Sequence, residues 1–205
     1  MKRHPGIAVV AAVTFALSGC ASSLAHEPEA PTTIGDVAVV HTNPLSEDEY
    51  VAEFGSRSDS VTQDGIRDEY WRAAATFPFP LPDGYAFPAD PILWGENDRY
   101  EGGYGAADAF SFWSGATATA AWAAYERGDE DTANQLLDAL ESGHVSPVRS
   151  IHLEPDSPGT DASIIDHAIR PARGGNFAPM LQWEIEPFLE RDENHAIATN
   201  AGDVQ

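Results

Sequence analysis

The stretch AADAFSFWSGATATAAWAAYERGDEDTANQLLDALESG, residues 106–143, contains the longest helical pattern in the chain. Its first half is rich in alanine and carries aromatic residues on more than one side, which predicts a central, largely buried helix from about Ala106 to Arg127. Gly128 ends that helix and Asp129 caps the next one. In this second helix the apolar residues recur at helical spacing up to Gly143, at Ala133, Leu136, Leu137 and Leu140. The stretch therefore predicts an αα-hairpin.

Two shorter helices precede the hairpin. Ser46 and Glu49 have the spacing of a capping box, and Gly55 ends the helix that they begin. A second helix fits residues 64–77, where apolar residues follow one face. Upstream of both, residues 37–40 alternate in hydropathy, which is the pattern of a short edge strand.

Proline and aromatic residues alternate in the segment 77–104. A continuous helix is excluded there by prolines at positions 78, 80, 82, 88 and 91. The same segment is too aromatic for a simple linker. We therefore expect a long, ordered but irregular arm that packs across the domain.

Beyond the hairpin, residues 148–153 predict a short strand or an extended arm. Asp161 then caps a helix that Pro171 stops, and residues 174–176 open a final helix that is bent or broken at Pro187. From about Asp192 the chain is expected to be frayed. The predicted class is mainly α: one small domain of about five helices with one αα-hairpin, the irregular arm, and one or two short strands.

The first twenty residues have the features of an export signal. Lys2 and Arg3 precede the apolar run 7–17, which is shorter than the ~20 residues that a membrane-spanning helix needs. The run ends in the tetrad Leu17-Ser18-Gly19-Cys20, which resembles the lipobox of bacterial lipoproteins. The resemblance implies cleavage before Cys20, lipid such as palmitate on Cys20, and an extracytoplasmic chain anchored to the cell membrane.

The expected organisation follows from these boundaries. Residues 1–19 are a lipoprotein signal peptide that is removed, and residues 20–44 are a flexible tether poor in apolar side chains. Residues 45–191 form the helical domain, and residues 192–205 form a disordered tail.

Charge narrows the range of partners. The chain has 33 acidic and 11 basic residues, and removal of residues 1–19, which hold Lys2 and Arg3, takes the formal charge from −22 to −24. Such a chain repels nucleic acid, so nucleic acid is excluded as a partner, whereas amines, metal ions or a basic protein surface could be attracted. The alternative, which we favour, is that the acidic surface only keeps the protein soluble. Cys20 is the only cysteine, so an internal disulfide and a cysteine-based zinc site are excluded.

Two sets of residues are candidates for a binding site. Aromatic rings beside carboxylates at a glycine-rich bend could bind a sugar or a quaternary amine, and this set comprises Trp94, Glu96, Asp98, Tyr100, Glu101 and Tyr104. The same residues would also suit an arm whose aromatic side chains only hold it to the core. A metal-ligand set comprises His152, Glu154, Asp166 and His167. This set of residues matches no known zinc-binding signature, and the alternative is that the residues belong to a solvated polar loop.

The sequence contains no motif of a known catalytic class. Asp166 and His167 could assist Ser150 or Ser163 as a nucleophile, but the chain has no Gly-x-Ser-x-Gly motif. We therefore expect a membrane-tethered, non-catalytic module, without a cofactor, that binds an envelope protein or a small ligand. The alternative is a small extracytoplasmic hydrolase that uses Asp, Glu and His, with or without a metal.

Overall fold

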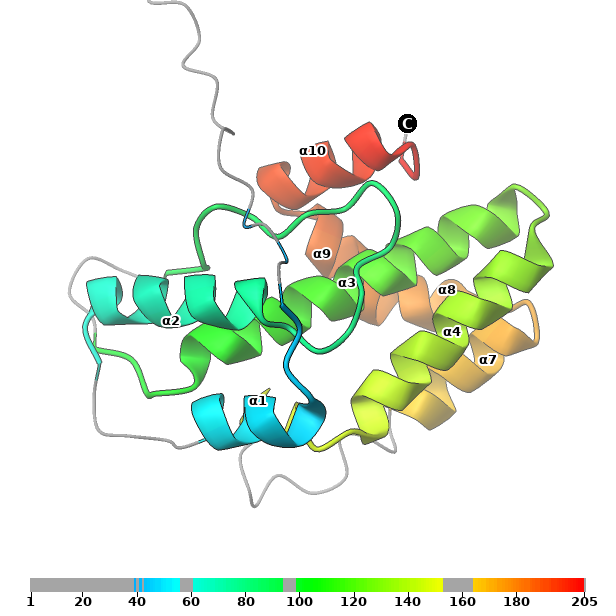
Figure 1. Ribbon diagram of the computed structural model, residues 1–205. Coiled ribbons are helices and arrows are strands. Elements are labelled where there is room, and N and C mark those ends of the chain that lie inside the picture. The colour runs from blue at the N-terminus through cyan, green and yellow to red at the C-terminus, as the bar shows by residue number, and fades with distance from the viewer. Residues whose placement is uncertain are drawn as a thin grey trace, which may run out of the picture. The chain divides into compact units, whose positions relative to one another are not determined.

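The computed structural model describes residues 39, 41, 43–55, 61–93, 99–152 and 164–204, all of which belong to one compact unit over residues 35–205. This unit is mainly helical, as predicted (Figure 1). Within the described residues there is no strand. The only pairings of extended backbone there are isolated bridges, between Val39 and Phe87 and between Val61 and Tyr100.

The central element is helix α3 (Tyr104–Glu126), and most of its residues are buried. It contacts α2 (Gln63–Ala75) and α4 (Glu130–Val145), and further elements from the C-terminal region also pack on it. Figure 1 shows α4 folding back beside α3, so the predicted hairpin is confirmed. Gly128, at φ +77°, provides the left-handed residue of the turn, and the Asp129 side chain accepts a hydrogen bond from the Thr132 amide at 3.1 Å.

The two hairpin helices are in tight contact at Gly143 of α4, whose missing side chain leaves room for the indole of Trp113 on α3. Trp113 is itself buried, and its Nε1–H donates to the carbonyl of Pro80 at 3.1 Å. The arm and the hairpin are therefore joined at one tryptophan.

Helix α1 (Glu47–Phe54) has the predicted capping box, with Ser46 and Glu49 satisfying each other's backbone amides, and Gly55 follows its last residue. Helix α2 begins one residue earlier than expected because Thr62 caps it through the amide of Gly65. It ends at Ala75, two residues before the predicted end.

The ordered arm is confirmed over residues 76–93. Its carbonyl groups accept hydrogen bonds from helical side chains: Tyr70 Oη donates to Pro88 at 3.0 Å and Trp71 Nε1 to Ala89 at 2.6 Å. Phe77 and Phe87 of the arm are buried, with ring centroids 5.5 Å apart. Prolines prevent a helix here, and the aromatic side chains instead supply the packing.

The expectation that Pro171 stops a helix is wrong. The chain runs from the π-helical segment η1 (Ile165–Ile169) directly into α7 (Arg170–Arg173). At this junction the Arg170 amide bonds to the Ile165 carbonyl five residues back. The wider π turn gives the pyrrolidine ring space, and a proline early in the next helix needs no amide hydrogen.

The same device recurs at Pro187. After α8 (Ala178–Met180), the π-helical segment η2 (Leu181–Ile185) leads into α9 (Glu186–Leu189), and the Glu186 amide bonds to the Leu181 carbonyl. Pro187 therefore neither breaks the helix nor ends it, and the C-terminal region contains more helical segments than were predicted.

Residues 149–152 form the helical turn α5 (Arg149–His152), so the strand or extended arm predicted at 148–153 is wrong over its described part. The cause is the turn at Ser146 and Pro147, whose carbonyls accept from the amides of Arg149 and Ser150 at 3.2 and 3.0 Å. Local hydrogen bonding here outweighs the extended propensity of Val148 and Ile151.

The frayed tail predicted from Asp192 is also wrong. Residues Asp192–Ala201 form helix α10, which Gly202 ends at φ +84°. Ala198 is fully buried, and the Asn194 side chain donates to the Phe188 carbonyl at 3.0 Å. Tertiary burial thus stabilises a helix whose sequence is only weakly amphipathic. None of the helices in the described parts of the chain is both long and apolar enough to cross a membrane.

Candidate ligand-binding pocket

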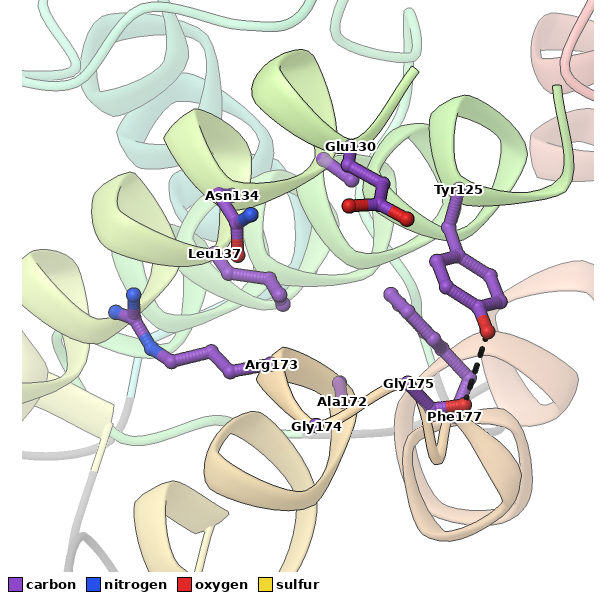
Figure 2. A pocket seen from close by; sticks show the side chains of 10 residues that line it. Tyr125, Glu130, Asn134, Leu137, Ala172, Arg173, Gly174, Gly175 and Phe177 are labelled. Atoms are coloured by element: carbon purple, nitrogen blue, oxygen red, sulfur yellow. Dashed lines mark hydrogen bonds between the residues drawn. The ribbon is translucent and has the colours of Figure 1, made fainter. Parts of the chain in front are cut away.

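A cavity of about 340 Å³ lies where the α3–α4 hairpin meets α7 and the loop to α8. We call it the α4–α7 pocket. Figure 2 shows the side chains around it, with α4 on one side and α7 on the other. Its lining consists of Tyr125, Glu130, Ala133, Asn134, Leu137, Ala172, Arg173, Gly174, Gly175 and Phe177.

Two stacked aromatic rings form one end of the pocket. The rings of Tyr125 and Phe177 have centroids 4.8 Å apart and planes inclined by 32°. The Tyr125 hydroxyl donates to the Gly175 carbonyl at 3.2 Å, the dashed line in Figure 2. Gly175 has φ +83°, and a Cβ there would lie 3.1 Å from the Tyr125 oxygen, so glycine allows this close approach. The tyrosine ring is therefore held in place.

The floor of the pocket is apolar and its rim is polar. Ala133, Leu137 and Ala172 are buried beneath it. Glu130 and Asn134 lie one turn apart on α4 and are exposed. Because they are four residues apart, they project from the same face of that helix toward the cavity (Figure 2).

Arg173 brings a positive charge to the wall, but that charge is neutralised by α4. Its guanidinium pairs with the carboxylate of Asp138, and Nη2 donates to Glu141 Oε2 at 2.5 Å. With Glu130, three carboxylates stand against one guanidinium. The pocket and its surroundings are therefore net acidic.

A second polar feature, which we call the Ser114 network, lies within the helical core. The hydroxyl of Ser114 on α3 donates to Glu184 Oε2 of η2 at 3.0 Å and lies 3.1 Å from Nε2 of His144 on α4. Ser114 and His144 are 3% and 2% exposed. Burial raises the pKa of the Glu184 carboxyl, while the hydrogen bond from Ser114 and the charge of Arg149 act in the opposite direction.

The Ser114 network contains the residue types of a hydrolase triad in a different order. In a triad, histidine lies between the nucleophile and the acid and takes the proton of the nucleophile. Here Ser114 lies between Glu184 and His144, and its hydroxyl hydrogen points to the carboxylate. The arrangement links three helical segments and keeps the serine away from solvent.

Asp108 of α3 is another ionisable residue of interest, and it was not among the candidate site residues predicted from the sequence. Its Oδ2 accepts from the amide of Ile92 at 2.8 Å and so attaches the arm to the central helix. Burial raises the pKa of this carboxyl to about 6, although the hydrogen bond from Ile92 and the charge of Arg191 oppose the shift.

Half of the predicted sugar or amine groove lies among the described residues. Tyr100 is buried and its ring centroid lies 5.0 Å from that of Tyr104, while Glu101 is exposed. Tyr100 also exchanges both backbone hydrogen bonds with Val61, at 2.7 and 2.8 Å. The remaining members, Trp94, Glu96 and Asp98, lie outside the described residues.

The predicted metal set is described only in part. Asp166 and His167 are exposed on η1, and Asp166 pairs with Arg170. The side chain of His152 and all of Glu154 lie outside the described residues. Within the described ranges, no group of three or more His, Cys, Asp or Glu side chains could hold a metal ion. A site completed by Glu154 therefore stays a prediction.

The remaining residues singled out in the sequence are the two candidate nucleophiles and the lipidation site. Ser150, one of the two candidate nucleophiles, donates its hydroxyl to the Pro147 carbonyl at 2.6 Å. Ser163, the other one, lies outside the described residues, as does the lipidation site Cys20. No residue of the α4–α7 pocket was predicted to bind a ligand, because its walls come from two segments about forty positions apart in the sequence. The Gly174-Gly175 pair was the one available signal, and it was interpreted as the start of the final helix.

No protein-family model, curated protein or solved structure matches this chain. The functional inference therefore rests on the geometry of the α4–α7 pocket and on the lipobox-like segment at residues 17–20.

Proposed function

We propose that the chain is an exported lipoprotein whose helical domain binds a small ligand at the cell envelope without changing it chemically. The observation that carries this proposal is the composition of the α4–α7 pocket. An apolar floor, a fixed aromatic pair and a few polar groups are the usual features of a small-molecule site. Among its described lining residues there is no serine, cysteine, threonine or histidine, so a nucleophile with its base does not converge there.

The size of the pocket supports the same reading. Its volume of about 340 Å³ falls in the range of about 300–1,000 Å³ that is usual for ligand pockets. It opens beside the exposed side chains of Glu130 and Asn134, so a ligand can enter without unfolding either helix.

Membrane attachment is the second part of the proposal, and the sequence supports it. The tetrad Leu17-Ser18-Gly19-Cys20 follows an apolar run of export type. Two acyl chains on the thioether-linked glycerol of Cys20 would anchor the chain stably, whereas one chain binds membranes only marginally. Residues 21–34, which precede the compact unit, would then separate the domain from the bilayer, and the predicted tether is shorter than 20–44 because Val39 pairs with Phe87.

A hydrolase is the second candidate function, and the contact between Ser114 and His144 is the observation that favours it. The burial of Ser114 and its central place in the network weigh against this function. A binding module therefore ranks first.

The binding proposal is tested by filling the pocket. Asn134→Trp places an indole at the mouth of the cavity, and Gln135→Trp places the same ring on the adjacent exposed position outside it. The mature protein in detergent is screened by thermal shift against amines, sugars and cell-wall fragments. A ligand at 100 times its Kd adds about 2.7 kcal/mol of stability. We expect at least one such shift in wild type and Gln135→Trp and none in Asn134→Trp. Shifts that persist in Asn134→Trp would reject the pocket as the site.

The anchoring proposal is tested separately with Cys20→Ala. We expect loss of radiolabelled palmitate and accumulation of the uncleaved precursor, because the thiol is the acceptor of the lipid. Ser22→Ala, two residues further along, is the matched control and should be labelled and cleaved normally. Palmitate on Cys20→Ala would contradict the proposal.

A further inference from the structure

The charges around the α4–α7 pocket define the chemistry of its ligand. Glu130 is the only carboxylate among the described lining residues, and it stands at the rim. Arg173, the one cationic side chain among those described lining residues, already pairs with Asp138 and Glu141 of α4. An incoming anion would have to displace these two carboxylates and would also approach Glu130. A cation meets the carboxylate of Glu130, and the positive charge of Arg173 is offset by the two carboxylates that pair with it.

The field of the whole protein acts in the same direction. The chain has 33 acidic and 11 basic residues, so its formal charge is −22 at pH 7. A concave site with low-dielectric walls concentrates counter-ions more strongly than an open surface does. Cations are therefore enriched at the mouth of the pocket, and this enrichment weakens as salt is added.

The inner walls select against a bare metal ion. Metal ions such as Ca²⁺ need six or more oxygen ligands, whereas the floor here is formed by Ala133, Leu137 and Ala172. The Tyr125 and Phe177 rings stand at the end of the cavity. Aromatic faces attract organic cations, and an apolar floor covers their carbon atoms. The pocket thus suits a charged head joined to an apolar body.

We infer that the α4–α7 pocket binds a small organic cation, an ammonium or guanidinium compound, with its charge at Glu130 and its apolar part between Leu137 and the Tyr125–Phe177 pair. This inference rests on the proposed binding function and specifies its ligand class. Asn134, one turn from Glu130, is placed to accept a hydrogen bond from the same head group.

The test compares matched ligands on the mature protein in detergent by isothermal titration calorimetry. Choline and agmatine are the cationic probes, and 3,3-dimethylbutan-1-ol is the uncharged isostere of choline. Glu130→Gln removes the charge at the rim, and Glu126→Gln removes a charge from the exposed last residue of α3, which does not line the pocket.

We expect at least one of the two cations to bind and the isostere not to. Glu130→Gln should weaken binding about tenfold or more, because the cationic head loses its opposite charge and agmatine also loses a charge-assisted hydrogen bond, whereas Glu126→Gln should change binding less than twofold. Affinity should fall as NaCl is raised from low to physiological concentration. Both variants replace exposed side chains, so unchanged melting temperatures will confirm that they are folded.

The possible failures are distinguishable. If the isostere binds as well as choline, or if Glu130→Gln has no effect while Asn134→Trp abolishes binding, the ligand class is wrong and the binding function stands. If neither cation binds but an anion or a neutral sugar does, and Asn134→Trp abolishes that binding, the result is the same. If no ligand is sensitive to Asn134→Trp, the binding function itself fails together with the inference.

Discussion

The hydroxyl of Ser114 donates a hydrogen bond to Oε2 of Glu184 across 3.0 Å, and it thereby connects the central helix α3 with the π-helical segment η2. The two residues are seventy positions apart in the chain. Because His144 contacts the same hydroxyl, a single serine joins α3, α4 and η2. The imidazole of His144 and the carboxylate of Glu184 therefore share this hydroxyl as a partner.

Ser114→Ala should destabilise the protein by about 1–3 kcal/mol at pH 7, since a buried carboxylate and imidazole each lose a partner. Urea unfolding of the mature protein measures this change. Ser111→Ala, on the same helix but half-buried, should cost less than about 0.5 kcal/mol. Equal losses in the two variants would show that the Ser114 network contributes no specific stability.

Because burial raises the pKa of Asp108, the stability of the protein should fall as the pH rises. Its pKa is about 6 in the folded protein against an ordinary 3.8, so the folded state holds the proton more tightly than the unfolded state does. The contribution of Asp108 to the free energy of unfolding is therefore fully present below about pH 4. It is lost as the pH rises through 6, and the loss is at most about 3 kcal/mol.

Asp108→Asn should reduce the fall in unfolding free energy between pH 4 and 8, because the amide oxygen can still accept from Ile92 and has no charge to bury. The exposed Asp68→Asn is the control for a change in net charge alone. If Asp108→Asn keeps the slope of wild type, the burial of this carboxyl does not govern the pH dependence.

Gly105 permits the crossing of α2 and α3. A Cβ on Gly105 would lie 2.6 Å from the backbone nitrogen of Tyr70 and 2.9 Å from the Ile66 carbonyl, and neither is a flexible side-chain atom. Gly105→Ala should therefore lower stability by about 3 kcal/mol, despite the better helix propensity of alanine. Gly174→Ala is the control, because its new Cβ would lie 3.3 Å from the nearest atom, the Pro171 carbonyl oxygen. Its melting temperature should fall much less than that of Gly105→Ala.

Covalent labelling separates a binding module from a serine hydrolase. A fluorophosphonate probe should not label the mature protein, because Ser114 is 3% exposed and its hydroxyl donates to Glu184 rather than to the imidazole of His144. Mass spectrometry after incubation measures this. Labelling that Ser114→Ala removes and Ser150→Ala keeps would make the hydrolase the first candidate.

Local sequence patterns correctly predicted the elements whose conformation is set by interactions within a few residues. The capping box at Ser46 and Glu49, the cap at Asp129 and the left-handed Gly128 each act within four residues, so their pattern specifies their geometry. The apolar repeat of α4 likewise predicts its buried face, since Leu137 and Leu140 are buried as expected.

The wrong predictions concern segments whose conformation depends on contacts between residues that are distant in the sequence. Pro171 was expected to stop a helix and Pro187 to bend or break one, but the helical path continues through both because π-helical turns before them leave room for the ring. Helix α10 is weakly amphipathic, and the burial of Ala198 and the bond from Asn194 to Phe188 stabilise it. No local pattern encodes these contacts.

The sequence by itself therefore determined the helical class, the central hairpin and the lipobox resemblance at Cys20. Only the tertiary structure decided that Glu130 and Arg173 line one cavity with the Tyr125–Phe177 pair at its end, and that Ser114 lies between His144 and Glu184. The physical reason is the range of the interactions. Caps, turns and helical periodicity act within a few residues, whereas a pocket depends on which helix faces pack together.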